Sequence, residues 1–175
     1  MKTGDKIAVV SPSRSLHSIF PKIAESGIEN LKEYFGLEPV VFPHAFSEIE
    51  LTYRNPKLRA NDLNLPFLDK DIKGIVRTIG SEESIRILDF MEPDIIQRNP
   101  KFFTGFSCTS TVTSHIYARN IASVYGKAVI AGFAQMANFP EEFVKYRSAL
   151  KGLKRFGNAK ILGIFGRLPK LDDHK

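Results

Sequence analysis

The chain has 175 residues, of which 43% are hydrophobic and 25% are charged, and it contains one cysteine. Domains cluster at about 100–150 residues, so this length corresponds to one domain with a core of its own. A single cysteine excludes a disulfide framework and a thiolate zinc site, and no apolar run approaches the ~20 residues of a membrane-spanning helix. Because the N-terminus carries no apolar leader, the sequence predicts a cytoplasmic protein.

The net charge of +6 is concentrated at the C-terminal end of the chain. Residues 1–140 carry a net charge of +1, whereas residues 141–175 carry +5. A nucleic-acid surface would spread basic residues over a folded face among stacking aromatic rings. The basic end therefore indicates a solvated helix face or a loosely packed terminus, and the body of the chain is not expected to bind nucleic acid.

Short β-branched runs alternate with amphipathic segments along the chain. In order, the pattern predicts a strand at 6–11, a helix at 21–35, a strand at 39–42, a helix at 55–68, a strand at 73–80, a helix at 84–91, a strand at 101–107, a helix at 109–123, a strand at 129–133, a helix at 140–151 and a strand at 160–165. This alternation predicts an α/β fold, an open and mostly parallel sheet with helices on both faces, as in Rossmann and flavodoxin folds. Ligands of such sheets bind at the carboxyl ends of the strands, which makes residues 11–15, 80–84 and 105–109 the candidate loops.

The strongest local signal is the sequence Thr-Gly-Phe-Ser-Cys at residues 104–108, between a predicted strand and a predicted helix. A serine at such a sharp bend holds its hydroxyl out of the sheet edge beside a main-chain N–H, as in a nucleophile elbow. Ser107 is therefore a candidate nucleophile, although the second glycine of that motif is missing and the residue could be a plain helix cap. The Cys108 thiol is a weaker alternative nucleophile at the same helix N-terminus.

The other two loops each have two interpretations. Gly80 and Ser81 could bring a second N–H donor toward Ser107, or they could form an ordinary turn before a helix that starts with acidic residues. The segment Ser-Pro-Ser-Arg-Ser at 11–15 could hold a phosphate or a carboxylate with its hydroxyls and guanidinium, or it could be a capped turn.

A serine nucleophile requires a base, usually a histidine oriented by a carboxylate. His115 lies two helical turns beyond Ser107, roughly 12 Å away, and cannot reach its hydroxyl. His44 ends a predicted strand and is expected to be structural, and His174 lies in the terminal tail. The sequence therefore contains no evident Ser-His-carboxylate set.

Several strings occur in a familiar order: GDKIAVVSPS, GIENLKEYFGLEPVVFPHAFSE, NPKLRANDLNLPFLDKDIKGIVRTIG, SIRIL, NPKFFTGFS and AGFAQM. Together they resemble the N-terminal domain of the LD-carboxypeptidase family of serine peptidases, in particular its microcin C immunity branch. The resemblance covers residues 4–144. It implies that residues 1–144 form the nucleophile domain, that residues 145–175 are a divergent basic tail, and that the family's C-terminal domain is absent.

The resemblance also implies roles for individual residues. Ser107 matches the family's catalytic serine, the N–H groups of Cys108 and Ser81 match its oxyanion donors, and Gly80 with Ser81 matches its substrate-binding glycine pair. The chain departs from the family where Cys108 replaces an aspartate and Ser81 replaces a glycine. The family's catalytic glutamate and histidine belong to the second domain and have no counterpart here.

The implied activity is hydrolysis of an amide bond in a murein-type peptide or a peptidyl-nucleotide, with no metal or cofactor and with a small peptide or aminoacyl-nucleotide as partner. Without the histidine and glutamate, the chain is expected to be inactive by itself. The face that packs against a second domain in the family would be exposed, and a homodimer that covers this face is one of the expected alternatives. The alternative is a non-catalytic α/β module that binds an anion, a nucleotide or a peptide.

Overall fold

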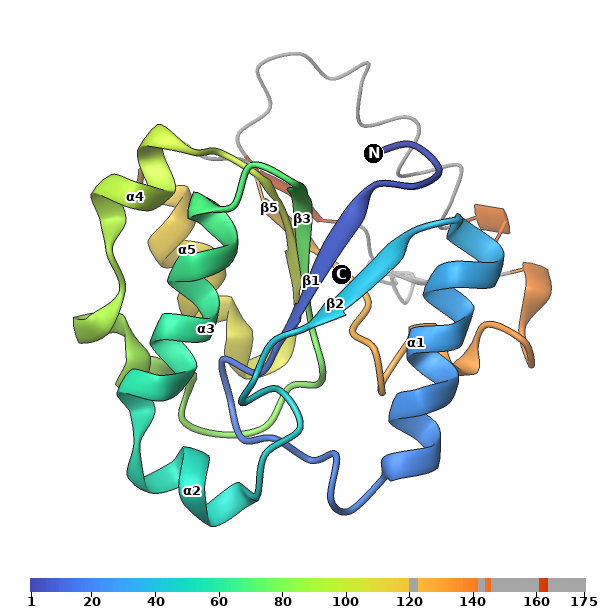
Figure 1. Ribbon diagram of the computed structural model, residues 1–175, viewed down its shortest axis with the longest axis horizontal. Helices are drawn as coiled ribbons and strands as arrows, with labels where there is room; N and C mark the ends of the chain where they lie inside the picture. Colours follow the sequence, from blue (N-terminus) through green and yellow to red (C-terminus); the bar gives the residue numbers. More distant parts are fainter. Residues whose placement is uncertain (120–122, 142–143, 146–160, 164–175) are drawn as a thin grey trace, which may run out of the picture.

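The computed structural model describes residues 1–119, 123–141, 144–145 and 161–163, and its centre is a parallel β-sheet (Figure 1). Six strands lie in the order β2-β1-β3-β4-β5-β6, and each neighbouring pair is parallel. The strands are β1 (Lys6–Val10), β2 (Glu38–Val41), β3 (Ile72–Arg77), β4 (Phe102–Gly105), β5 (Ser123–Tyr125) and β6 (Ile161–Gly163). The predicted open parallel sheet is confirmed.

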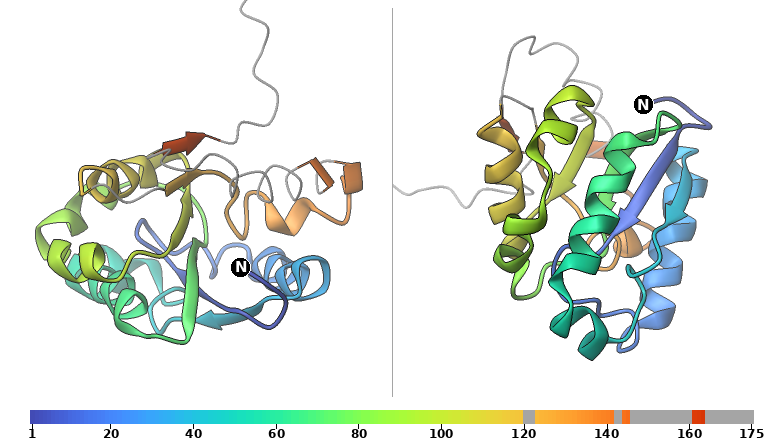
Figure 2. Two further views of the ribbon diagram at one scale, coloured as in Figure 1. Left: turned by 90° about the horizontal axis from the view of Figure 1, so that it is seen from above. Right: turned by 60° about the vertical axis from the view of Figure 1, so that its left-hand side comes forward.

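Helices cover both faces of this sheet (Figures 1 and 2). Helix α1 (Pro21–Phe35) and the 3₁₀ turn η3 (Phe133–Gln135) pack on one face. The other face carries four elements with a larger apolar core: α3 (Pro56–Leu68), η1 (Ser84–Phe90), α4 (Pro93–Arg98) and α5 (Ser110–Tyr117). Two short helices, α2 (Ile49–Arg54) and η2 (Ser107–Thr109), lie in the loops at the end of the sheet toward which the strands run.

Strand β1 shows how the two cores arise from one sequence run. Successive side chains of a strand point to opposite faces, so an apolar run fills both sides of a covered sheet. Ile7 and Val9 join the core beneath α1, while Ala8 and Val10 join the core beneath α3 and α5. All four are buried.

Helix α1 begins and ends where the sequence predicts. Pro21 occupies the first helical turn, where its missing N–H removes no hydrogen bond. Gly36 follows the helix in the left-handed conformation, with φ 63°, and its N–H donates to Lys32 O. Such a residue closes a helix without a Cβ clash.

The prediction of a fifth strand at 129–133 is wrong, and so is the C-terminal part of the helix predicted at 109–123. Helix α5 ends at Tyr117, and β5 occupies Ser123–Tyr125. The N–H groups of residues 129 and 130 instead donate to the carbonyls of Arg77, the last residue of β3, and Thr78, the residue after it. The run is apolar because it packs beneath α1, where Val129 O and Cγ1 would lie within 2.7 Å of a Cβ on Gly27.

The C-terminal predictions are only partly covered by the described residues. Strand β6 pairs with β5, which confirms a strand within 160–165 over its described part. Residues 140, 141, 144 and 145 are helical, and the rest of the helix predicted at 140–151 lies outside the described residues, as does most of the basic tail. The domain boundary at residue 144 stays a prediction. None of the described helices is long and apolar enough to span a membrane.

Candidate active site

The three candidate loops meet at one edge of the sheet, because β1, β3 and β4 are parallel neighbours. This edge lies at the bottom of the sheet in Figure 1. The pairing continues past the strand ends, since Thr78 N–H donates to Val10 O at 2.8 Å. The loop after β3 therefore lies between the loop after β1 and the bend after β4.

Ser107 occupies the bend between β4 and η2. The preceding residue, Phe106, is extended with φ −145°, and Ser107 itself turns to φ 58°. A non-glycine residue in the left-handed region is uncommon and costs of order 1 kcal/mol or more, so it marks a bend that the surrounding structure imposes. Ser107 is exposed, and its hydroxyl makes no hydrogen bond to any described residue. It is thus not a helix cap within the described structure.

Gly80 lies directly against Ser107, as the sequence predicts. A Cβ built on Gly80 would lie 2.9 Å from Ser107 Cβ and 3.1 Å from Ser107 Oγ. Real Cβ atoms essentially never approach another atom so closely, and the residue therefore has to be glycine for the two loops to meet. The glycine here serves close approach, because its φ is not in the positive range.

Ser81 holds a backbone conformation that suits glycine better than serine. Its φ is 124°, in the region that L-residues rarely adopt, and Glu83 nearby has φ 74°. Two strained residues in one short turn indicate that neighbouring contacts determine its path. This is the position at which the sequence predicts a second main-chain donor for the site.

A buried arginine lies beneath the bend. Arg77, the last residue of β3, has no exposed surface, donates from Nη1 to Thr109 Oγ1 at 2.7 Å, and has its Cζ 4.0 Å from the centre of the Phe106 ring. Its Nε and Nη2 have no hydrogen-bond partner among the described residues. Burial lowers the pKa of Arg77 to about 9, well below the usual value of an arginine, against opposing contributions from Tyr125 and Cys108.

The loop at 11–15 directs its hydroxyl groups inward. Ser11 and Ser15 both donate to Ala45 O at 2.8 Å, and Ser11 also hydrogen-bonds to Thr78. All three serines of this loop are buried. These contacts connect the loop to its neighbours and leave the hydroxyls of Ser11 and Ser15 engaged, which favours the capped-turn interpretation over an anion cradle.

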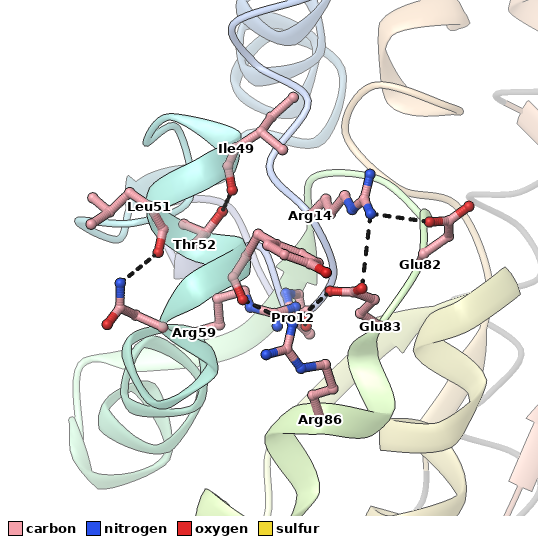
Figure 3. A network of polar contacts seen from close by, with 11 residues as sticks. Pro12, Arg14, Ile49, Leu51, Thr52, Arg59, Glu82, Glu83 and Arg86 are labelled. Carbon is pink, nitrogen blue, oxygen red and sulfur yellow. Dashed lines mark hydrogen bonds and ion pairs between the residues drawn. The ribbon is translucent and has the colours of Figure 1, made fainter.

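An ion-pair network connects this loop to the turn at 81–83 (Figure 3). Arg14 lies 3.3 Å from Glu82 and 3.8 Å from Glu83, and Arg86 lies 3.0 Å from Glu83. Both guanidinium groups also lie over the ring of Tyr53, at 5.2 and 4.9 Å from its centre. The strained turn at 81–83 is thereby connected both to the loop at 11–15, through Arg14, and to η1, through Arg86.

No described histidine hydrogen-bonds to Ser107. His44 Nδ1 lies 2.9 Å from the buried Asp62 carboxylate, in the loop after β2. Since β1 and β3 separate β2 from β4, that loop is roughly 14 Å from the bend. His115 is on α5, where burial lowers its pKa, and His17 stacks on Phe46. His174 is outside the described residues.

The part of the chain with described coordinates also holds no group of acidic, His or Cys side chains that could bind a metal.

Comparison with known protein families identifies the family of this chain. The family model for the N-terminal domain of LD-carboxypeptidases, peptidase family S66, matches residues 7–126. The chain belongs to the LD-carboxypeptidase family. The resemblance seen in the sequence is therefore confirmed.

Individual relatives of the LD-carboxypeptidase family agree with this assignment. The putative carboxypeptidase YocD of Bacillus subtilis is 28% identical over 145 residues, which are 82% of this chain and 44% of YocD. The structure of the microcin C7 self-immunity protein MccF with aspartyl sulfamoyl adenosine superimposes with a TM-score of 0.72 at 28% identity, covering 86% of this chain and 44% of MccF. An MccF-like protein from Streptococcus pneumoniae in complex with AMP has a TM-score of 0.69 at 30% identity, covering 78% and 40%. The chain thus spans less than half the length of each relative.

The sequence predicted part of this candidate site and missed part. It placed Ser107, Gly80 and Ser81 at one sheet edge, where the structure also places them. It missed Arg77 and the phenol of Tyr125, which accepts the Ser107 N–H at 3.3 Å. The missed signal for Arg77 was a charged residue directly after the apolar run Ile75–Val76, at the end of a strand that is buried at every position except Lys73.

Proposed function

We propose that this chain is the nucleophile-bearing domain of a serine hydrolase of the LD-carboxypeptidase type, with Ser107 as the nucleophile. The observation that carries the proposal is the exposed Ser107 hydroxyl at a left-handed bend, packed against Gly80. An exposed hydroxyl that has no hydrogen-bond partner in the described part of the chain is available to a substrate carbonyl. The reaction is cleavage of an amide bond by attack of Ser107 Oγ on the carbonyl carbon.

The oxyanion that forms in this attack is held by main-chain N–H groups. The Cys108 N–H belongs to the first turn of η2, where N–H groups lack an acceptor within the helix. The Ser81 N–H lies on the turn that Gly80 brings against Ser107. Because both donors are main-chain groups, a cysteine and a serine at these positions remain compatible with the role. Gly80 and Ser81 also form the surface against which the substrate carbonyl lies.

The substrate is a small peptide of murein type or an aminoacyl- or peptidyl-nucleotide. Support comes from the relatives, since the MccF structure contains aspartyl sulfamoyl adenosine and the Streptococcus pneumoniae structure contains AMP. No metal or cofactor is required, because a serine hydrolase needs only a nucleophile, a base and oxyanion donors.

The base comes from outside the described residues. No described histidine contacts Ser107, and the chain covers less than half of its relatives. Loss of triad members lowers serine-hydrolase rates by on the order of 10⁴–10⁶. We therefore expect the 175-residue chain alone to hydrolyse amides at a negligible rate, while Ser107 keeps the geometry of a nucleophile.

A fluorophosphonate probe tests the nucleophile without requiring turnover. Because the base is missing from the described residues, we expect phosphonylation at Ser107, located by peptide mass spectrometry, chiefly when imidazole is added as an external base. Ser107→Ala should abolish the label. The matched control is Ser110→Ala, because Ser110 is a hydroxyl residue of the same bend that donates to Ser107 O at 2.6 Å.

Labelling that survives Ser107→Ala, or no Ser107 label even with imidazole, would contradict the proposal. A second candidate, a nucleotide-binding module, is favoured by the AMP in the Streptococcus pneumoniae relative. It predicts that AMP raises the unfolding temperature of a chain that shows no label, because a ligand that binds only the folded state stabilises it.

A further inference from the structure

Arg77 contacts both sides of the bend that carries Ser107. Its guanidinium lies on the ring of Phe106, the residue before Ser107, and donates to Thr109, two residues after it. A Cβ built on Gly80 would lie 3.1 Å from Ser107 Oγ and 3.3 Å from Arg77 Nη1. Ser107 Oγ and Arg77 Nη1 are therefore no more than roughly 6 Å apart, a distance over which one charge still perturbs another.

The guanidinium has no anionic partner among the described residues. None of the described ion pairs involves Arg77, and its Nε and Nη2 make no hydrogen bond there. The titratable groups that act on its charge are Cys108 of η2 and Tyr125 of β5. The pKa of Arg77, although lowered to about 9, leaves the side chain charged at neutral pH.

A buried charge without a partner is unfavourable. Buried charges in proteins are usually paired, and an apolar residue in their place is often as stable or more stable. At this position an apolar side chain would continue the pattern of β3, whose residues Ile75 and Val76 are fully buried. An uncompensated positive charge beside Ser107 becomes favourable only when negative charge develops there. Attack by Ser107 creates such charge, first on Oγ as its proton leaves and then on the carbonyl oxygen.

We propose that Arg77 is a positioning residue for Ser107, which fixes the bend through Phe106 and Thr109 and electrostatically favours negative charge on the side chain at position 107. The inference rests on the proposed function, in which Ser107 is the nucleophile. It goes further by assigning the positive charge of the site to a residue beneath the bend.

The test replaces the hydroxyl at 107 by a thiol, whose ionisation can be followed directly. The parent chain carries Ser107→Cys and Cys108→Ser, so the thiol at 107 is its only one. Its conversion to thiolate is followed against pH by ultraviolet absorbance and by the rate of alkylation with iodoacetamide. Arg77→Met is then added, which removes the charge and leaves a side chain of similar length.

We expect the titration midpoint of the thiol to rise by about one pH unit or more in the Arg77→Met chain, as for loss of an opposite charge at this distance. Arg77→Gln, which keeps an N–H donor for Thr109 but no charge, should give the same rise. Arg77→Lys should retain most of the parent midpoint. The matched control is Arg59→Met. Arg59 is also buried, and two of its nitrogens have no hydrogen-bond partner among the described residues, but it donates to Pro12 O, away from the bend.

An unchanged midpoint in a folded Arg77→Met or Arg77→Gln chain would overturn the inference, and so would an equal rise in Arg59→Met. Circular dichroism of each variant establishes that it is folded. If either Arg77→Met or Arg77→Gln does not fold, the other still tests the inference. The result is independent of the probe experiment. Absence of a Ser107 label overturns the nucleophile assignment, whereas an unchanged thiol midpoint overturns only the role of Arg77.

Discussion

The bend at Ser107 and the loop at 11–15 follow strands β4 and β1 at the same edge of the sheet, and both are rich in hydroxyl residues. They use those hydroxyls in opposite ways. Ser11 and Ser15 are buried and donate to one carbonyl, Ala45 O. Ser107 is exposed, has a left-handed backbone, and keeps its hydroxyl free of any described partner.

The difference separates a stabilising role from a reactive one. A buried hydroxyl that donates to a carbonyl contributes about 1 kcal/mol to folding and costs more if its acceptor is left alone. A free hydroxyl on a strained bend contributes nothing comparable, and the strain must be balanced elsewhere in the fold. The bend also lies over Arg77, which has no ion pair with any residue that the structure describes, whereas Arg14 in the other loop is paired with Glu82 and Glu83. Removal of a hydroxyl from the loop at 11–15 is therefore expected to lower stability, whereas removal of the Ser107 hydroxyl is expected to abolish reactivity and leave stability almost unchanged.

The largest effect is expected for Gly80→Ala. Its new Cβ would lie 2.9 Å from Ser107 Cβ, so either the bend or the turn at 80–83 has to move. We expect a loss of about 3 kcal/mol in the free energy of unfolding and about a hundredfold slower labelling of Ser107 by a fluorophosphonate. Urea denaturation and labelling kinetics measure the two effects.

Gly4→Ala is the matched control for this substitution. Gly4 has φ 84°, and a Cβ there would meet nothing within 4 Å, so only backbone strain is introduced. We expect a loss of about 1 kcal/mol and no change in labelling. If both variants behave alike, the contact between Gly80 and Ser107 is not what joins the two loops.

The next largest effect is a gain of stability. Arg77→Met removes a buried charge that has no ion-pair partner in the described part of the chain. We expect the free energy of unfolding at neutral pH to rise by about 2 kcal/mol, since such replacements by apolar residues often stabilise a fold. The gain should depend on pH. The folded-state pKa of Arg77 is about 9, well below the ordinary value of an arginine, so at pH values between the two the unfolded chain binds the additional proton.

The sign of this pH dependence follows from that window. Below about pH 9 the side chain is charged in both states, and the full cost of burying it falls on the folded state. As the pH rises through 9, the folded arginine loses its proton and the unmodified chain recovers stability relative to Arg77→Met. Denaturant titrations of both chains at neutral pH and near pH 10 measure the difference. A variant that is less stable at neutral pH would show that Arg77 mainly supports the fold.

Smaller effects distinguish the two sets of serines. Ser11→Ala removes a buried donor to Ala45 O and a partner of Thr78, and should cost about 1.5 kcal/mol. Ser107→Ala removes a hydroxyl without a described partner and should change stability by less than about 0.5 kcal/mol, while it abolishes labelling. Equal losses of stability in the two variants, measured by thermal unfolding, would remove the distinction between the regions.

The sequence predicts those features that local pattern and sheet topology determine. Alternating runs predict the parallel sheet, and because neighbouring parallel strands end at one edge, they also place Gly80 beside Ser107. The hydrophobic pattern gave a wrong strand at 129–133, where apolar residues are buried beneath a helix and not in the sheet. Val129 is apolar because it packs under α1, and nothing local separates that from a strand.

Two features of the site have no local signal in the sequence, because they are tertiary. The guanidinium of Arg77 is stabilised by Phe106 and Thr109, which lie about thirty residues further along the chain. The positive φ of Ser81 was indicated only by the resemblance, in which a glycine stands at this position, and not by the serine itself. Both residues break a local rule, and both lie at the candidate site.

Ser81→Gly provides the finest test of the comparison. Glycine adopts φ 124° without steric strain, but it also gains entropy in the unfolded chain, and the net gain in stability should be about 1 kcal/mol. If the N–H at this position supports the oxyanion, removal of the Cβ should preserve labelling or accelerate it, because the main-chain donor remains. Ser84→Gly is the control, since Ser84 hydrogen-bonds to Cys108 O and Thr111 and should destabilise when replaced. Slower labelling in a more stable Ser81→Gly chain would show that the serine side chain itself, and not the N–H beneath it, takes part at this edge.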